Sequence, residues 1–337
     1  MQQEKPESGK VSLRCSRNRL DAIRNRINGK IQGYSNEAED QILDIVRNGS
    51  YDFVWFDEWM YGSTVKKLKH EFPKLPLFVF YHTTARPFLE MMSHIPLSLK
   101  YPMRIWDYWL FRRGEKLSAL YSDANVILNE RDKSIFTQRY GARNILMLPM
   151  CLRDTAKIAE VPKNPGEFNL LFVGGGVHKP NVDGIKWFAK NVMPKLDQRA
   201  VLHIVGNKMD DFRDAPEFRG NDRIRVTGRV DSLDEFYNMA DLVVSPIFYG
   251  GGMMTKVAEA LMYGKNFLAT HHALNGYDGL EHCRCDTAEE FAAKINELIA
   301  SGVDRYNPEL RKIYEQRYSL EAMKNTLREF LTQQHII

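Results

Sequence analysis

The sequence has no long apolar run, few cysteines and no strong excess of charge of either sign. Its longest uninterrupted apolar stretch is Leu77–Tyr81, whereas a membrane-spanning helix needs about 20 apolar residues. The first residues, MQQEKPESGK, do not follow the basic-then-apolar plan of a secretory signal peptide. Only four cysteines occur in 337 residues, too few for a disulfide scaffold in a chain of this length. We therefore expect a cytoplasmic protein.

Charge is nearly balanced but unevenly distributed. The net charge is +4, from 47 basic and 43 acidic side chains. Residues 1–150 carry 23 basic and 17 acidic side chains, and residues 151–337 carry 24 and 26. A mildly basic first half is compatible with anionic lipid, a phosphorylated substrate or nucleic acid, and also with an ordinary solvated surface. Charge alone does not choose among these.

From about residue 51 the chain alternates short β-rich runs with amphipathic stretches, which is typical of an α/β fold with parallel sheets. The expected strands are 51–57, 77–81, 124–128, 144–148, 169–174, 201–206, 224–228, 241–246 and 266–270. The expected helices are 36–48, 63–72, 106–121, 131–140, 182–192, 233–239, 254–263, 288–301, 308–317 and 320–333. Several strands end in Gly or Ser-Pro, where doubly wound sheets carry their ligand-binding loops.

The length and a shift in composition predict two domains. We expect an N-terminal domain over 1–150, a linker over 151–167, a second domain over 168–318 and a C-terminal helix over 319–337 that packs back on the first domain. The linker is rich in proline and charge, without apolar periodicity.

The first 45 residues fit the alternation poorly. Only KVSLRC (10–15) could be a strand, and no apolar strand with a Gly-rich turn opens the chain. We therefore expect a reduced first domain with a smaller sheet than the second. An uncovered sheet edge favours pairing with another chain, so a homodimer is one expectation.

The strongest chemical signal follows the strand expected at 241–246. Three glycines, Gly250–Gly252, lead directly into a helix that carries Lys256 and Glu259. Glycines allow close backbone approach, and a helix N-terminus offers unpaired N–H groups and a positive dipole end. Together they suit a phosphate. Lys256 would add a point charge for a diphosphate, and Glu259 could accept hydrogen bonds from vicinal hydroxyls.

This stretch resembles glycosyltransferase family 4, retaining enzymes that transfer a sugar from a nucleotide-sugar donor. The likeness extends over residues 51–337 and is densest from 169 to 280. Family members share the Gly-rich turn, the Lys and the Glu-Ala of the following helix, and LLFVGGGVHKPNVDGIKWFAKNVMPKL (170–196) looks like their opening strand and loop. The resemblance implies the GT-B fold, in which two Rossmann-like domains face each other across a cleft.

The resemblance also implies a donor site for a UDP- or GDP-sugar. The residues expected to bind the donor are Gly174, Gly175, Gly176, Arg229, Val230, Gly250, Gly251, Gly252, Lys256 and Glu259. Among them, Arg229 and Val230 would border the nucleobase, Lys256 would hold the diphosphate and Glu259 the ribose. Two positions depart from the family: Gly251 stands where many members have a second Glu, and Met254 replaces a common basic residue.

The expected first domain offers three further candidates. His82 ends the strand at 77–81, where family members often have a His that faces the donor sugar, so we assign it as the catalytic candidate. Asp57 and Glu58 end the preceding strand and could orient or deprotonate an acceptor hydroxyl. The alternatives are an ordinary strand-end His and a solvated acidic pair.

Residues 97–116, LSLKYPMRIWDYWLFRRGEK, interleave aromatic and basic side chains. Such a pattern suits peripheral contact with the inner face of a membrane, and many family members act on lipid-linked acceptors. A core-packed helix with a charged outer face is the alternative.

We expect no metal site and no resident cofactor. Cys283 and Cys285 lie near histidines but lack the spacing of a zinc site. No Asp-x-Asp occurs, which agrees with GT-B chemistry, where protein donors stabilise the leaving diphosphate.

The function expected is transfer of a sugar to a saccharide or lipid-linked acceptor, in cell-surface polysaccharide or glycoconjugate synthesis, with no nucleic-acid partner. A catalytically degenerate nucleotide-sugar-binding subunit is the alternative, and a GT-B epimerase is a more distant one.

Overall fold

The structure is a computed structural model that describes residues 19–30, 34–86, 89, 92, 101–142 and 144–336. The strand expected at 10–15 and the first residues of the segment 97–116 therefore lie outside the described residues. The chain divides into two compact units, the first holding most residues up to Met147 and the second most residues from Leu148 onward. In the described part, no helix is long and apolar enough to cross a membrane.

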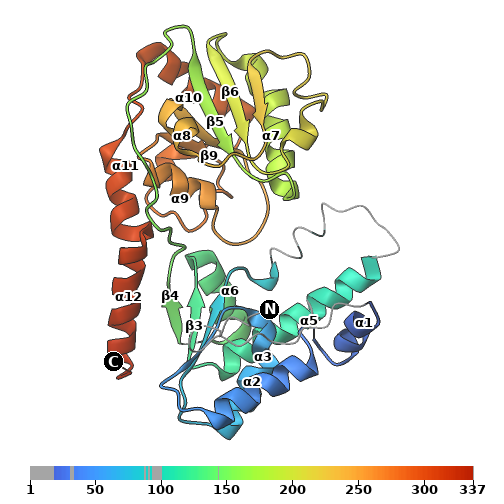
Figure 1. The fold of residues 1–337 in the computed structure, drawn as a ribbon. Coiled ribbons are helices and arrows are strands. Elements are labelled where there is room, and N and C mark those ends of the chain that lie inside the picture. Colours follow the sequence, from blue (N-terminus) through green and yellow to red (C-terminus); the bar gives the residue numbers. More distant parts are fainter. Residues whose placement is uncertain are drawn as a thin grey trace, which may run out of the picture. The chain divides into compact units, whose positions relative to one another are not determined.

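The first unit is built on a parallel sheet whose strands pair in chain order, β1-β2-β3-β4 (Figure 1). The strands are β1 (Val54–Phe56), β2 (Leu77–Tyr81), β3 (Ala124–Ile127) and β4 (Ile145–Met147). The helices of this unit are α1 (Arg19–Ile27), α2 (Asn36–Asn48), α3 (Gly62–Glu71), α5 (Tyr101–Tyr121) and α6 (Glu130–Tyr140). The strands and helices expected in this unit are confirmed, each within a few residues of its predicted ends, apart from α5, which begins earlier. Helix α1 was not expected.

Helices α3 and α5 pack closely because glycines face each other. A β-carbon at Gly62 would collide with the carbonyl oxygen of Gly114. Next to this contact Trp59 stacks on Phe111, with ring centroids 3.6 Å apart. Both rings are buried, so this pair anchors α5 against the sheet's core.

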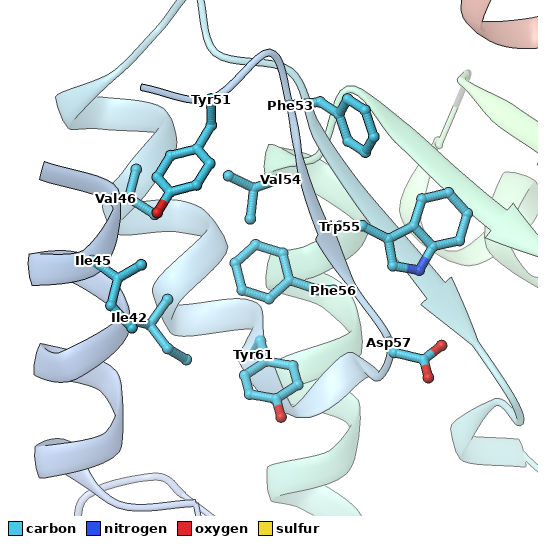
Figure 2. A pocket seen from close by; sticks show the side chains of 10 residues that line it. All are labelled: Ile42, Ile45, Val46, Tyr51, Phe53, Val54, Trp55, Phe56, Asp57 and Tyr61. Atoms are coloured by element: carbon cyan, nitrogen blue, oxygen red, sulfur yellow. The ribbon is translucent and has the colours of Figure 1, made fainter. Parts of the chain in front are cut away.

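Strand β1 pairs only with β2 in the described part of the chain. Beside its other edge lies an apolar groove of about 460 Å³. Figure 2 shows its lining: Ile42, Ile45, Val46, Tyr51, Phe53, Val54, Trp55, Phe56, Asp57 and Tyr61. The reduced size of the first domain and a homodimer through this edge stay predictions, because residues 1–18 are outside the described part.

The second unit has a parallel sheet of order β7-β6-β5-β8-β9. Its strands are β5 (Phe168–Val173), β6 (Ala200–Val205), β7 (Ile224–Thr227), β8 (Leu242–Ser245) and β9 (Phe267–Ala269). Its helices are α7 (Lys179–Asn191), α8 (Asp234–Met239), α9 (Thr255–Met262), α10 (Ala288–Ser301), α11 (Pro308–Ile313) and α12 (Leu320–Gln333), with a π-helical turn over Tyr314–Tyr318. Strand order reverses between β5 and β8, so the loops at their carboxyl ends diverge and leave room for a ligand.

Residues 151–167 hydrogen-bond to the second unit. The amide of Lys157 donates to Asp234 at 3.0 Å and that of Ala159 to Asn238 at 3.2 Å. Leu152 forms a parallel bridge with Ser319, the N-cap of α12. The domain boundaries, the linker role of 151–167 and the packing of 319–337 on the first domain stay predictions.

Candidate functional site

The turn after β5 requires glycine because neighbouring backbone lies against it. The amide of Gly174 donates to Val205 at 2.9 Å, and that of Gly176 to Asn207 at 2.9 Å. A β-carbon at Gly176 would collide with the carbonyl of Lys208, and one at Gly206 with the carbonyl of Gly174. The loops after β5 and β6 therefore form one closely packed backbone surface at the carboxyl edge of the sheet.

Asn181, in the first turn of α7, connects this turn to helix α9. Its side-chain amide donates to the carbonyl of Gly175 at 3.1 Å. Its side-chain oxygen accepts from the Lys256 ammonium at 2.9 Å. The two segments expected to bind a diphosphate, 174–176 and the start of α9, are thus joined through one buried amide.

Lys256 lies on α9 and is only 7% exposed. Its ammonium is 5.5 Å from the centroid of the Phe172 ring. Burial lowers the pKa of Lys256 to about 8, and the nearby Glu259 carboxylate opposes this in part. A bound anion would stabilise the charged form of this lysine, because a second negative group would compensate the cost of burying the ammonium.

Glu259 is held by an aromatic pair. Its Oε2 accepts from the Tyr237 hydroxyl at 3.0 Å. Tyr237 in turn stacks on Tyr263, with centroids 4.3 Å apart and ring planes at 6°. Burial raises the pKa of Glu259, while Tyr237 and Lys256 oppose the rise. The carboxylate is therefore fixed in orientation.

The second Gly-rich turn lies close to the start of α7. Gly250 has φ +134° and Gly252 has φ +71°, backbone conformations that favour glycine. A β-carbon at Gly250 would lie 3.7 Å from the Pro180 ring and 3.9 Å from His272. Gly251 is exposed. The structure thus brings 174–176, 250–252 and α9 together at one end of the sheet.

Arg229 and Val230 follow β7 at the same carboxyl edge. Gly228, just before them, accepts a hydrogen bond from the amide of Gly206 at 3.2 Å. The Arg229 side chain is exposed. Their location on the loop next to that of β6 is compatible with contact to a nucleobase, and that role stays a prediction.

In the first unit, Asp57, Glu58 and His82 meet because β1 and β2 are parallel neighbours. The His82 Nε2 lies 3.4 Å from Asp57 Oδ1. Among the described residues, the buried Oε2 of Glu58 has no hydrogen-bond partner. Burial raises the pKa of Glu58, and His82 opposes the rise. The structure thus groups these three residues, while their catalytic and acceptor roles stay predictions.

A buried carboxylate that the sequence analysis missed supports the segment after His82. The amide of Ala85 donates to Glu115 Oε1 at 2.9 Å, and the Tyr140 hydroxyl donates to Glu115 Oε2. Thr84 donates to Asp132 at 3.1 Å. Burial raises the pKa of Glu115 to about 7. The sequence signal for this site is Glu115 itself, an acidic residue within the expected helix 106–121. Its hydrogen-bond donors could not be predicted from residue spacing, because they lie in other segments of the chain.

Residues 167–301 match the family described as "Glycosyl transferases group 1". This region contains both Gly-rich turns, Asn181, Lys256 and Glu259. This region is therefore similar to a glycosyl transferase group 1 domain. A comparison with curated proteins finds no match.

Solved structures of glycosyltransferases share the fold of this chain at low identity. Sucrose-phosphate synthase from Thermosynechococcus elongatus matches with 14% identity and a TM-score of 0.67, over 89% of this chain and 78% of that one. Anabaena Alr3699/HepE in complex with UDP matches with 13% identity and a TM-score of 0.65, over 88% and 82%. The lipopolysaccharide outer core galactosyltransferase WaaB matches with 14% identity and a TM-score of 0.59, over 88% and 80%. The expected GT-B fold is confirmed, and the match of residues 167–301 supports a glycosyltransferase. Membership of family 4 in particular stays a prediction.

Proposed function

We propose that the chain is a retaining glycosyltransferase that uses a UDP- or GDP-sugar and acts on a saccharide or lipid-linked acceptor in cell-surface polysaccharide or glycoconjugate synthesis. The observation that supports a donor site is the pair of hydrogen bonds that connects Gly175 through Asn181 to Lys256. It ties a glycine turn to a helix N-terminal turn with a buried cation, which is the arrangement a diphosphate needs.

In this proposal the leaving diphosphate lies between the turn at 174–176 and the start of α9. The Lys256 ammonium either leaves the Asn181 side-chain oxygen for a phosphate oxygen or donates hydrogen bonds to both. Glu259, held by Tyr237, accepts hydrogen bonds from the ribose hydroxyls. Catalysis comes from orientation and from stabilising the charge of the leaving group, without a metal or other cofactor.

UDP is the nucleotide to test first. Among the structural neighbours, HepE is described with UDP and with UDP-glucose, and the pneumococcal O-GlcNAc transferase GtfA with UDP and GlcNAc. The backbone surface around Gly174 and the loop at Arg229 in this chain could accept either a UDP- or a GDP-sugar, so GDP-sugars belong in the same panel.

On the first unit, we assign His82 to the transferred sugar and Asp57 and Glu58 to the acceptor. In the part of the chain that the structure describes, no group donates to the buried Oε2 of Glu58. This supports the assignment, because a buried acceptor atom without a donor costs free energy unless a ligand supplies one. Glu58→Gln should therefore reduce turnover with acceptor more than donor binding. Equal effects on both would remove Glu58 from the acceptor side.

A turnover assay with and without acceptor tests the proposed activity. Nucleotide sugars are incubated with the full chain, and the release of nucleoside diphosphate and the anomeric configuration of the product are measured. Acceptor-dependent release with a retained anomeric configuration supports the proposal. Donor binding without any release would favour the nucleotide-sugar-binding subunit, and isomerised donor would favour an epimerase.

We further propose a cytoplasmic location. It is supported by the cysteines of the described residues (Cys151, Cys283 and Cys285), which are all free thiols, as expected in a reducing compartment. Burial raises the pKa of Cys283 to about 12 and that of Cys285 to about 11, so neither is a reactive thiolate.

A further inference from the structure

Helix α1 of the first unit turns its large apolar side chains to solvent. Leu20 is 79% exposed, Ile23 52% and Ile27 69%. Their spacing of three and four residues places them on one side of the helix. The buried member of the helix is instead the polar Asn25, at 6% exposure. A helix that served only to cover a core would have the opposite arrangement.

The neighbouring helix α5 also turns large apolar side chains to solvent. Trp106 is 49% exposed and Trp109 is 59% exposed, and they are three residues apart on one helix side. Arg26 of α1 binds Asp107 of α5 through two hydrogen bonds, at 2.6 and 3.1 Å, and Figure 1 shows the two helices close to each other. We call the five residues Leu20, Ile23, Ile27, Trp106 and Trp109 the α1–α5 face.

The two helices that carry the α1–α5 face are rich in basic side chains. Helices α1 and α5 together contain seven basic and three acidic residues. Of these acids, Asp107 is paired with Arg26 and Glu115 is fully buried. The Arg112 guanidinium lies 5.3 Å from the Trp109 ring centroid, and Arg24, Arg113 and Lys116 are exposed. The surface is therefore both apolar and positive.

We propose that the α1–α5 face docks on the surface of a membrane that contains anionic lipid. Tryptophan is the side chain that best suits the interface between headgroups and acyl chains, and leucine and isoleucine enter the acyl boundary. Arginine and lysine on the same helices pair with lipid phosphates. A second copy of the chain fits this face less well, because its own arginines would approach like charges.

The face would bring the first unit to a lipid-linked acceptor, and in that respect it builds on the proposed function. Its test is independent of sugar transfer, because vesicle binding is measured without donor or acceptor. Failure to bind vesicles would leave the donor site untouched, and failure of the donor site would leave vesicle binding untouched.

The experiment is co-sedimentation of the full chain with phosphatidylcholine vesicles that contain or lack phosphatidylglycerol, at about 0.1 M salt and at higher salt. We expect binding only with phosphatidylglycerol, weakened by salt. Trp106→Ala with Trp109→Ala should abolish it. Arg24→Gln with Lys116→Gln should weaken it by about 25-fold, since each basic residue near an anionic surface contributes about 1 kcal/mol, or about fivefold.

Ile158→Ser is the matched control, because Ile158 is 45% exposed but belongs to the second unit; it should bind like the wild type. Leu20→Ser with Ile27→Ser is a second apolar variant if the tryptophan variant does not fold by circular dichroism. Equal binding to both kinds of vesicle, no binding, or unchanged binding of the apolar variants would overturn the proposal. So would a dimer that the tryptophan substitutions convert to a monomer in sedimentation.

Discussion

Replacement of Lys256 by Met separates the role of its charge from the role of its packing. The ammonium lies 2.9 Å from the Asn181 side-chain oxygen and the residue is only 7% exposed. Methionine keeps an unbranched apolar side chain of similar reach beside Phe172 and removes the charge. We expect the fold to survive and the affinity for a diphosphate to fall.

Two opposing effects on stability nearly cancel in this variant. A pKa of about 8 in the folded protein, against the ordinary value of 10.5, means that burial of the charge costs about 3 kcal/mol at pH 7. Methionine removes that cost, but leaves the Asn181 oxygen without its donor, which costs about 1–3 kcal/mol. The free energy of unfolding at pH 7 should therefore change by no more than about 2 kcal/mol.

The pH dependence of the same free energy has a definite sign. Between about pH 8 and 10.5 the unfolded chain holds a proton on Lys256 that the folded protein has lost. Wild-type stability should therefore gain a rising contribution over this range, and Lys256→Met should lack it. Urea unfolding across the range measures the difference between the two slopes.

Ligand affinity tests whether the Lys256 ammonium binds the diphosphate. Loss of a charge-assisted hydrogen bond of about 1.5–3 kcal/mol should weaken UDP binding about 10- to 150-fold in calorimetric titration, with little effect on uridine. Lys265→Met is the matched control. Burial also lowers the pKa of Lys265 to about 8, but its ammonium bonds backbone carbonyls, among them that of Arg305 at 2.7 Å. Equal losses for UDP and uridine, or an equal UDP loss in Lys265→Met, would refute the role of Lys256.

Three further outcomes are expected. Glu259→Gln should weaken nucleotide-sugar binding by about 1–3 kcal/mol without a change in melting temperature, because Tyr237 can still donate to the amide oxygen; unchanged affinity would remove Glu259 from the site. Burial lowers the pKa of His203 to about 4, so about 3 kcal/mol of stability should be lost between pH 6.5 and 4, and His203→Gln should flatten that part of the denaturation profile. If the edge of β1 pairs with a second chain, Trp55→Pro should convert a dimer to a monomer in sedimentation, because the amide of Val54 donates to Pro76 on the β2 side and the next amide points to the other edge; a wild-type monomer at micromolar concentration would contradict the pairing.

Strands and most helix ends were predictable because local signals agree with the fold. The bounds expected for α10 and α12 are confirmed, since Thr287 and Ser319 cap them with the side-chain hydrogen bonds that such residues favour. Helix α1 was not predicted because its apolar residues face solvent. Its sequence therefore lacks the periodic apolar side chains of a helix that packs on a core. Helix α7 begins earlier than expected because Pro180 is tolerated in a first turn.

The parts of the candidate site that could be predicted are the sequence motifs in the loops that follow strands β5 and β8. Parallel strands with a switch between β5 and β8 bring 174–176 and 250–259 to one edge, and this followed from the alternation of elements. The roles of Asn181 and Tyr237 did not follow, because a buried polar side chain finds its partner through packing between elements distant in sequence. The same holds for Glu115, whose partners lie 30 and 25 residues away.

A thermal-shift panel of nucleotide sugars on the full chain tests the donor site most directly. A ligand at 100 times its dissociation constant stabilises the folded state by about 2.7 kcal/mol, enough to raise the melting temperature by several degrees. We predict such a rise with at least one UDP- or GDP-sugar and a much smaller one with the matching nucleoside. No rise with any nucleotide sugar at millimolar concentration, or equal rises with sugar nucleotide and nucleoside, would contradict a diphosphate site at Lys256.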